Sequence, residues 1–322
     1  MVIIFILIMI GTVLYKKALL SDDSSKQISG IIANFCNPAL LISSVFESTE
    51  RIPTRELLNG AFLVFITYAI LIACSLLLPI LFHVKKEETY IYRLVTIFAN
   101  TGFIGIPLIS AVLGPGALIY VSINNLGFNI LMYTFGIASI KKAKEREISA
   151  NYSGTADNYS TKKEKKNTAA SLLHIIKNFI NIGTISSVLT IVLYVSDLNI
   201  PALFSNTISY VGRSTTFLSM LVLGVSLAQL NIASFLQRKK LFFFTLFRLI
   251  IIPVGSIFIL RAFTKDSLLL YTQILMLALP AGNMPLILSK QHGLESETIS
   301  VGILLSTVLS LITIPIVTLF VQ

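Results

Sequence analysis

The chain has 322 residues, of which 55% are hydrophobic and 12% are charged, and its mean hydropathy is +0.84. Soluble globular domains carry about 25% charged residues, so a composition this apolar over the whole length indicates an integral membrane protein. The formal net charge of +10 is compatible with a nucleic-acid partner. The distribution of the charges, described below, explains it without one, and we expect no nucleic acid.

Common catalytic and metal-binding motifs are absent from the sequence. There is no CxxC, HExxH, GxSxG or Walker pattern. Cys36 and Cys74 lie in apolar segments and are interpreted as small buried hydrophobic residues. His83, His174 and His292 all fall near segment ends. We therefore expect no catalytic residues, no metal and no cofactor, and a membrane-embedded enzyme is disfavoured.

Ten apolar segments are each close to the ~20 residues that a helix needs to cross a bilayer. The first has no basic region before it and is followed by Lys16 and Lys17, so it is interpreted as a span and not as a cleaved signal. The ten expected spans are residues 2–19, 28–46, 57–82, 90–114, 117–140, 172–195, 208–230, 241–262, 268–288 and 299–320.

A polar stretch separates five spans from five. It holds KKAKER at one end and KKEKK at the other, and this composition indicates disorder. The Asn-Tyr-Ser triplets at Asn151 and Asn158 match a glycosylation acceptor, which we interpret as chance in a cytoplasmic linker. We therefore expect a first five-helix repeat over 1–140, a cytoplasmic polar linker over 141–170 and a second repeat over 171–322. Because five is odd, the second repeat enters the membrane inverted.

The basic residues predict the orientation. Lys and Arg gather in alternate connections, including the central linker, and an excess of this kind marks the cytoplasmic side. The opposite connections hold Arg51, Arg55, Arg261 and Lys265. We therefore expect a multi-pass protein of the plasma (cytoplasmic) membrane with both termini outside.

Two spans contain residues that interrupt a helix. In hydrocarbon the freed backbone groups must find protein or water partners, so both breaks are expected to face a cavity. Interrupted segments at corresponding places in two halves point to the binding site of a transporter. The helix-breaking residues are Gly102, Gly105 and Pro107 in the fourth span and Pro280, Gly282 and Pro285 in the ninth.

Neutral amides, and not carboxylates, are the polar groups of the expected membrane interior. Every Asp and Glu falls at a connection or a span end, which weighs against a sodium/proton exchanger, since ion sites in transporters use buried carboxylates. Amide N–H groups and the positive N-termini of two half-helices can hold a carboxylate without a fixed cation. The predicted substrate contacts are Asn100, Thr101, Asn129, Asn37 and Asn283.

Other polar residues in the spans are given a structural interpretation. Asn34, Asn124 and Gln273 are expected to form interhelical hydrogen bonds, worth ~0.6 kcal/mol on average in membranes. Arg248 is expected to extend its side chain to the cytoplasmic surface. Pro38 either kinks its helix or opens room for a ligand.

These motifs resemble those of the auxin efflux carrier family. Residues 100–108, NTGFIGIPL, are similar to the fourth-span motif of that family, and residues 279–285, LPAGNMP, to its ninth-span motif. Residues 37–41, NPALL, resemble its second span. The chain is identified as a bacterial-type member, with Ala99 where plant members have a proline at the crossover.

The resemblance implies an all-α integral membrane protein. Its ten transmembrane helices form two inverted five-helix repeats, arranged as a scaffold domain and a mobile transport domain. The broken fourth and ninth helices would cross near Asn100 and Ala281. Family members carry carboxylate-bearing molecules, so Asn100 would meet the carboxylate and Asn129 would line the same pocket.

The predicted function is a secondary carrier that moves a small organic anion by alternating access, with electrogenic export. The alternative is a sodium- or proton-coupled organic-anion symporter of a related inverted-repeat fold. A channel is disfavoured because the polar groups cluster near the breaks and do not form a continuous polar face. The expected partners are a small carboxylate and the lipid bilayer, and a homodimer is compatible with the sequence.

Overall fold

The computed structural model describes residues 2–48, 51–151, 179–196, 198, 200–229, 238–294 and 297–321. Within these residues the chain is helical, apart from connections and one isolated backbone bridge. Six helical stretches of the described part are long and apolar enough to cross a membrane, and shorter apolar helices accompany them. The label η marks a short π or 3₁₀ turn.

The first half comprises α1 (Val2–Lys16), α2 (Asp22–Ile31), η1 (Ile32–Cys36), α3 (Asn37–Glu47), α4 (Thr54–Leu81), α5 (Thr89–Ile97), η2 (Thr101–Gly105), α6 (Ile106–Leu113), η3 (Pro115–Ala117), α7 (Leu118–Leu131), η4 (Met132–Gly136) and α8 (Ile137–Asn151). The second half comprises α10 (Ile182–Ser196), α11 (Ala202–Ala228), α13 (Lys239–Arg261), α14 (Ser267–Ala278), α15 (Met284–Gln291) and α16 (Glu297–Val321).

The outer surface of the bundle is apolar. Large hydrophobic side chains such as Phe65, Ile80 and Phe258 are at least 70% exposed. A soluble protein would bury them, whereas lipid solvates them without cost. The chain therefore folds as a multi-pass membrane protein whose interior is defined by packing between helices.

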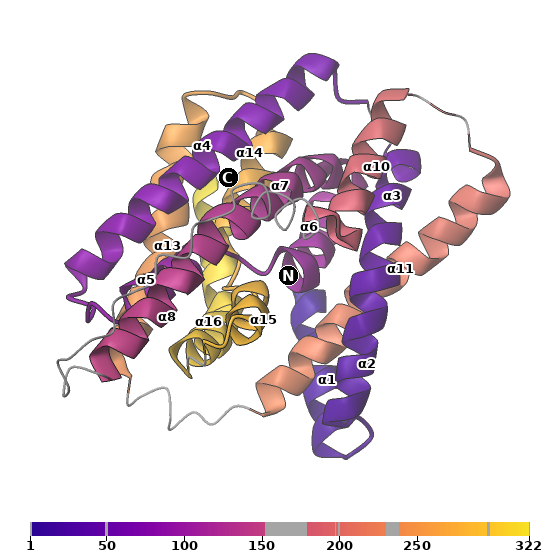
Figure 1. The fold of residues 1–322 in the computed structure, drawn as a ribbon. Coiled ribbons are helices and arrows are strands. Elements are labelled where there is room, and N and C mark those ends of the chain that lie inside the picture. Colours follow the sequence, from indigo (N-terminus) through magenta and orange to yellow (C-terminus); the bar gives the residue numbers. More distant parts are fainter. Residues whose placement is uncertain are drawn as a thin grey trace.

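Two groups of helices are visible in Figure 1. The first contains α1, α3, α10 and α11, and the second contains α4, α5, α13, α14 and α16. In the first group, α1 and α11 pack closely at Gly224, where an added Cβ would lie 2.2 Å from the Ile8 carbonyl oxygen. Thr12 Oγ1 also donates to the Gly224 carbonyl oxygen at 3.0 Å. Small residues of this kind let helix backbones approach in membranes.

The helix α8 extends into the segment where we expected the central linker to begin. It continues to Asn151, beyond the expected span end at residue 140, so the KKAKER segment is helical and not disordered. Lys, Ala, Glu and Arg are strong helix formers, and Lys144 Nζ donates to the His292 carbonyl oxygen at 2.9 Å. The rest of the linker, with the Asn158 triplet, lies outside the described residues.

The described part of the sixth span contains the helix α10. The helix α10 starts at Ile182, and the Asn181 side chain accepts a hydrogen bond from the Thr184 amide at 3.0 Å. An Asn in this place satisfies one of the free amides at a helix start. Residues 172–178, where the prediction placed the beginning of this span, lie outside the described residues.

Candidate functional site

The fourth and ninth spans are both broken, and their breaks meet. α5 ends at Ile97 and α14 ends at Ala278. In between, Ala99 and Ala281 form an antiparallel backbone bridge, in which the Asn100 amide donates to the Pro280 carbonyl at 2.8 Å and the Gly282 amide donates to the Phe98 carbonyl at 2.9 Å. We call residues 98–100 and 279–283 the crossover. Two of the backbone amides that the breaks leave without a helical partner, those of Asn100 and Gly282, are thus satisfied by the opposite break.

The first break lies earlier in the chain than its predicted residues. Gly102, Gly105 and Pro107 all belong to the helix that follows it. This helix begins at Asn100, whose Oδ1 accepts from the Phe103 amide at 3.1 Å. Pro107 is accommodated as the second residue of α6, directly after the wide turn η2, and does not end a helix there. The prediction that these three residues make the break is therefore wrong.

In the ninth span the predicted residues do lie at the break. Pro280 and Gly282 are part of the crossover, and Pro285 is the second residue of α15, near the first-turn position that proline favours. An added Cβ on Gly282 would lie 2.7 Å from the Ala99 carbonyl oxygen. The approach of the two backbones therefore requires glycine at this position.

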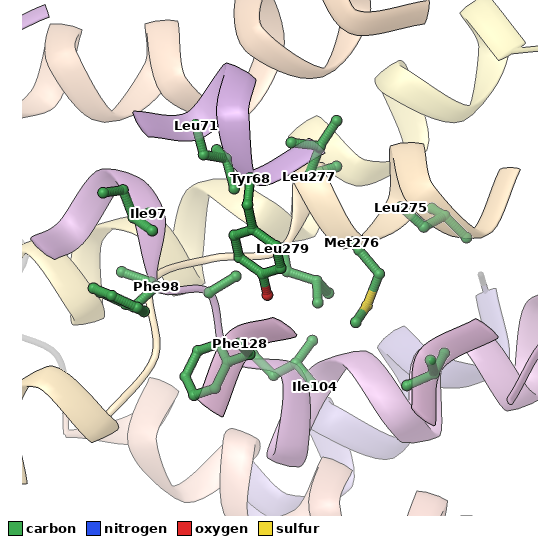
Figure 2. Packing of buried hydrophobic residues seen from close by; sticks show 14 of the residues in the cluster. Tyr68, Leu71, Ile97, Phe98, Ile104, Phe128, Leu275, Met276, Leu277 and Leu279 are labelled. Atoms are coloured by element: carbon green, nitrogen blue, oxygen red, sulfur yellow. The ribbon is translucent and has the colours of Figure 1, made fainter. Parts of the chain in front are cut away.

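One side of the crossover is closed by apolar side chains (Figure 2). Phe98, Leu279, Ile104, Phe128 and Met276 pack there and are all nearly fully buried. The Phe98 and Phe128 rings meet edge to face with centroids 5.6 Å apart. This packing keeps the backbone bridge dry on that side.

Another side of the crossover opens into a cavity of about 210 Å³. None of its lining side chains, among the described residues, is charged. Pro38 lines it as well, which agrees with the interpretation that this residue opens room beside the break. All five predicted contact residues line this cavity: Asn37, Asn100, Thr101, Asn129 and Asn283.

Two further amides in the cavity were not among the predicted contacts. Asn125 and Asn181 line it, and the Asn181 Nδ2 atom donates to Asn129 Oδ1 at 3.3 Å. Asn125 Nδ2 donates to Ser187 Oγ at 3.0 Å. Asn125 could have been predicted from the sequence, because it lies in the same amide-rich segment as Asn129. Asn181 follows the linker, and no sequence pattern there indicates a place in the cavity.

Asn37 connects the second span to the helix after the first break. Its Nδ2 atom donates to the Gly102 carbonyl oxygen at 3.1 Å. Its Oδ1 atom is buried and has no hydrogen-bond partner among the described residues. The amide is thus held in place by its donor side.

Backbone donors are also available at the crossover. Among the described residues, no protein group accepts from the amides of Gly102, Met284 and Leu286, which lie at the starts of the two half-helices. A helix N-terminus carries about half a positive elementary charge. An uncharged cavity with such donors suits the binding of an anion.

Asn124 and Gln273 serve as interhelical contacts, as expected. Asn124 Nδ2 donates to Gln273 Oε1 at 3.2 Å, and Thr67 Oγ1 donates to the same oxygen at 3.3 Å. Tyr68 donates its hydroxyl to Asn124 Oδ1 at 3.1 Å. For Asn34 the expectation is wrong, because this residue is exposed and donates to the Gly30 carbonyl of its own helix at 2.8 Å.

The side chain of Arg248 does not reach the surface, so this expectation is also wrong. Arg248 is 1% exposed. Its Nε atom donates to the Thr96 carbonyl oxygen at 3.4 Å, and Nη1 donates to the Leu279 carbonyl oxygen. Both acceptors lie at the C-terminal ends of half-helices, where carbonyl groups have no partner within the helix and attract a cation.

Comparison with known proteins gives the family of the chain. No individual curated protein matches it. A family model described as a membrane transport protein matches residues 1–318, which include both breaks and all the helices around the cavity. The chain therefore belongs to this family of membrane transporters, the auxin efflux carrier family whose motifs it resembles.

Proposed function

We propose that this transporter is a secondary carrier that moves a small organic anion, bound through its carboxylate, across the plasma membrane by alternating access. The observation that carries the proposal is the uncharged cavity at the crossover, lined by Asn100, Asn129 and Asn283. Two half-helices begin beside it, so its donors are concentrated where a carboxylate would be held. Its volume of about 210 Å³ is below the ~300–1,000 Å³ of drug-sized sites, which favours a small acid.

The helix pairings support two inverted repeats. In the first half α4 packs against α5 and α7, and in the second half α13 packs against α14 and α16. The second span of the first half (α3) packs against the first span of the second half (α10). In the same way, the second span of the second half (α11) packs against the first span of the first half (α1). In the proposed mechanism the crossover moves with α4, α13 and the helices around them, relative to α1, α3, α10 and α11.

Contacts at the two ends of the bundle are in keeping with the proposed grouping of the connections on two opposite sides of the membrane. Lys240 Nζ donates to the His83 carbonyl oxygen at 2.7 Å, so two connections expected on the cytoplasmic side touch. At the opposite end, Arg261 Nη2 donates to the Val321 carbonyl oxygen at 3.1 Å. This places the C-terminal helix end beside a connection expected outside, in keeping with both termini outside.

The proposed transport is electrogenic. The protein returns to its starting state after each cycle, so without a coupled ion the net charge moved is that of the substrate. At 100 mV one charge is worth ~2.3 kcal/mol, or roughly a fifty-fold accumulation ratio. A cell interior that is negative therefore favours export of the anion. A cation-coupled symporter would need an ion site, and no carboxylate lines the cavity.

The test is uptake of labelled acetate, benzoate, succinate and malate into proteoliposomes. A carrier gives saturable flux that unlabelled substrate competes for, and Asn100→Ala should reduce that flux at least tenfold. Hydrogen bonds to charged groups are worth ~1.5–3 kcal/mol, and the same change removes the cap of the following helix. Asn34→Ala is the matched control, because this exposed amide contacts only its own helix. Flux that does not saturate, or parental flux in Asn100→Ala, would contradict the proposal.

A further inference from the structure

Arg248 is a buried cation for which no described carboxylate forms an ion pair. It is the tenth residue of α13, near the middle of the helix. A buried charge is strongly unfavourable unless other groups compensate it. The compensation must therefore come from the groups that Arg248 contacts.

Those groups are the C-terminal ends of the two half-helices that enter the crossover. Thr96 is the penultimate residue of α5, and Leu279 follows the last residue of α14. Arg248 donates to both carbonyl oxygens. Each helix C-terminus carries about half a negative elementary charge, so one guanidinium balances the pair.

This balance changes the electrostatics of the cavity. With the two negative helix ends compensated, the two positive ones remain, at the starts of η2 and α15. Asn100 and Asn283 precede these starts and line the cavity. The field in the cavity then favours an anion.

We propose that Arg248 is a resident cation, held in a site formed by the Thr96 and Leu279 carbonyl oxygens, that makes the crossover selective for anions. The inference rests on the proposed function and deepens it. Arg248 does not line the cavity, so it is a positioning residue that acts through the half-helices. A bound sodium ion could compensate the same helix ends only while present, whereas the guanidinium does so permanently. The carrier then needs no coupling ion.

The fit of Arg248 also argues against a purely structural role. Its Nη2 atom is buried without a hydrogen-bond partner among the described residues. An unsatisfied buried donor is destabilising, and a smaller uncharged donor that pairs only with the Thr96 and Leu279 carbonyl oxygens would avoid it. Stability alone therefore does not account for an arginine here, whereas the need for charge at the crossover does.

The test compares Arg248→Lys with Arg248→Gln in sodium-free proteoliposomes, with labelled acetate, benzoate, succinate and malate. Lys keeps the charge, whereas Gln keeps a hydrogen-bond donor without the charge. We expect Arg248→Lys to transport within about threefold of the parent and Arg248→Gln to lose at least tenfold. Arg261→Gln is the matched control, since it removes an Arg contact with a helix C-terminal carbonyl far from the crossover, and it should match the parent.

Equal loss in the Lys and Gln variants, or parental transport in the Gln variant, would overturn the proposal. A second measurement does not depend on carboxylate transport: the unfolding midpoint of Arg248→Ala with millimolar methylguanidinium. We expect a saturable rise in this variant that is absent from the parent protein. If the parent carries none of the four acids but the rise is observed, the proposed function fails and the cation site stands. Absence of the rise overturns the cation site itself.

Discussion

Gly282→Ala tests the close approach of the two backbones at the crossover. The new Cβ would lie 2.7 Å from the Ala99 carbonyl oxygen, 3.0 Å from its carbon and 3.2 Å from the Asn100 nitrogen. All three neighbours are backbone atoms, so no flexible side chain can move aside. The backbones must separate, which stretches the bridge hydrogen bonds of 2.8 Å and 2.9 Å.

The magnitude follows from that geometry. Overpacking of a buried position costs ~1–3 kcal/mol, and each buried polar group left unpaired costs a further ~1–3 kcal/mol. The four residues that make the bridge bonds, Phe98, Asn100, Pro280 and Gly282, are all buried, so water has little access to the separated groups. With only one of these groups left unpaired, the crossover should be destabilised by about 2–6 kcal/mol, and we expect carboxylate uptake to fall at least tenfold.

The assay is uptake into proteoliposomes, together with the unfolding midpoint of the purified variant. Gly255→Ala is the matched control, because no atom lies within 4 Å of a Cβ built on this helical glycine. It should transport as the parent does, and its stability should stay the same or rise, since Gly is ~0.5–1 kcal/mol less favourable than Ala in a helix. Parental uptake in Gly282→Ala would refute the reasoning.

Three further predictions concern packing, orientation and charge. Gly224→Ala should lower the unfolding midpoint by forcing α1 from α11, because its Cβ would meet the Ile8 carbonyl oxygen, while the substrate concentration for half-maximal uptake stays unchanged. In a cysteine-free background, Lys265→Cys should react with an impermeant thiol reagent from outside intact cells, and Ser160→Cys should react only after lysis. Exchange of a monocarboxylate should be independent of voltage, because the charge of Arg248 balances the bound anion, whereas net transport should depend on voltage.

Each of these predictions has an outcome that contradicts it. An altered half-maximal concentration in Gly224→Ala would mean that α1 and α11 shape the cavity. Labelling of the Ser160 variant without lysis would reverse the proposed orientation. Voltage-dependent exchange of acetate would show that the charge of Arg248 does not move with the substrate.

Local patterns in the sequence were enough to predict a multi-pass membrane protein and the existence of two breaks. Apolar segments of about twenty residues have the length that a helix needs to cross a bilayer. The two prolines of the LPAGNMP segment disfavour a continuous helix there. Four of the cavity amides, those of Asn37, Asn100, Asn129 and Asn283, were predictable for a similar reason. A carboxamide in an apolar span is costly unless it has a partner, so its position makes it a candidate for a contact, although Asn34 shows that the partner can be the helix itself.

The tertiary structure decided the details that depend on partners distant in the chain. Asn34 and Asn37 are three residues apart and would share a face of a regular α-helix, but Asn34 lies in the wide turn η1, which changes the phase of the helix, and only Asn37 meets Gly102. The first break lies at Phe98–Asn100 because Ala281 offers a backbone partner there. Arg248 remains buried because the Thr96 and Leu279 carbonyls of two other spans surround it. No local pattern encodes these contacts, since each one joins residues that only the packing of the helices brings together.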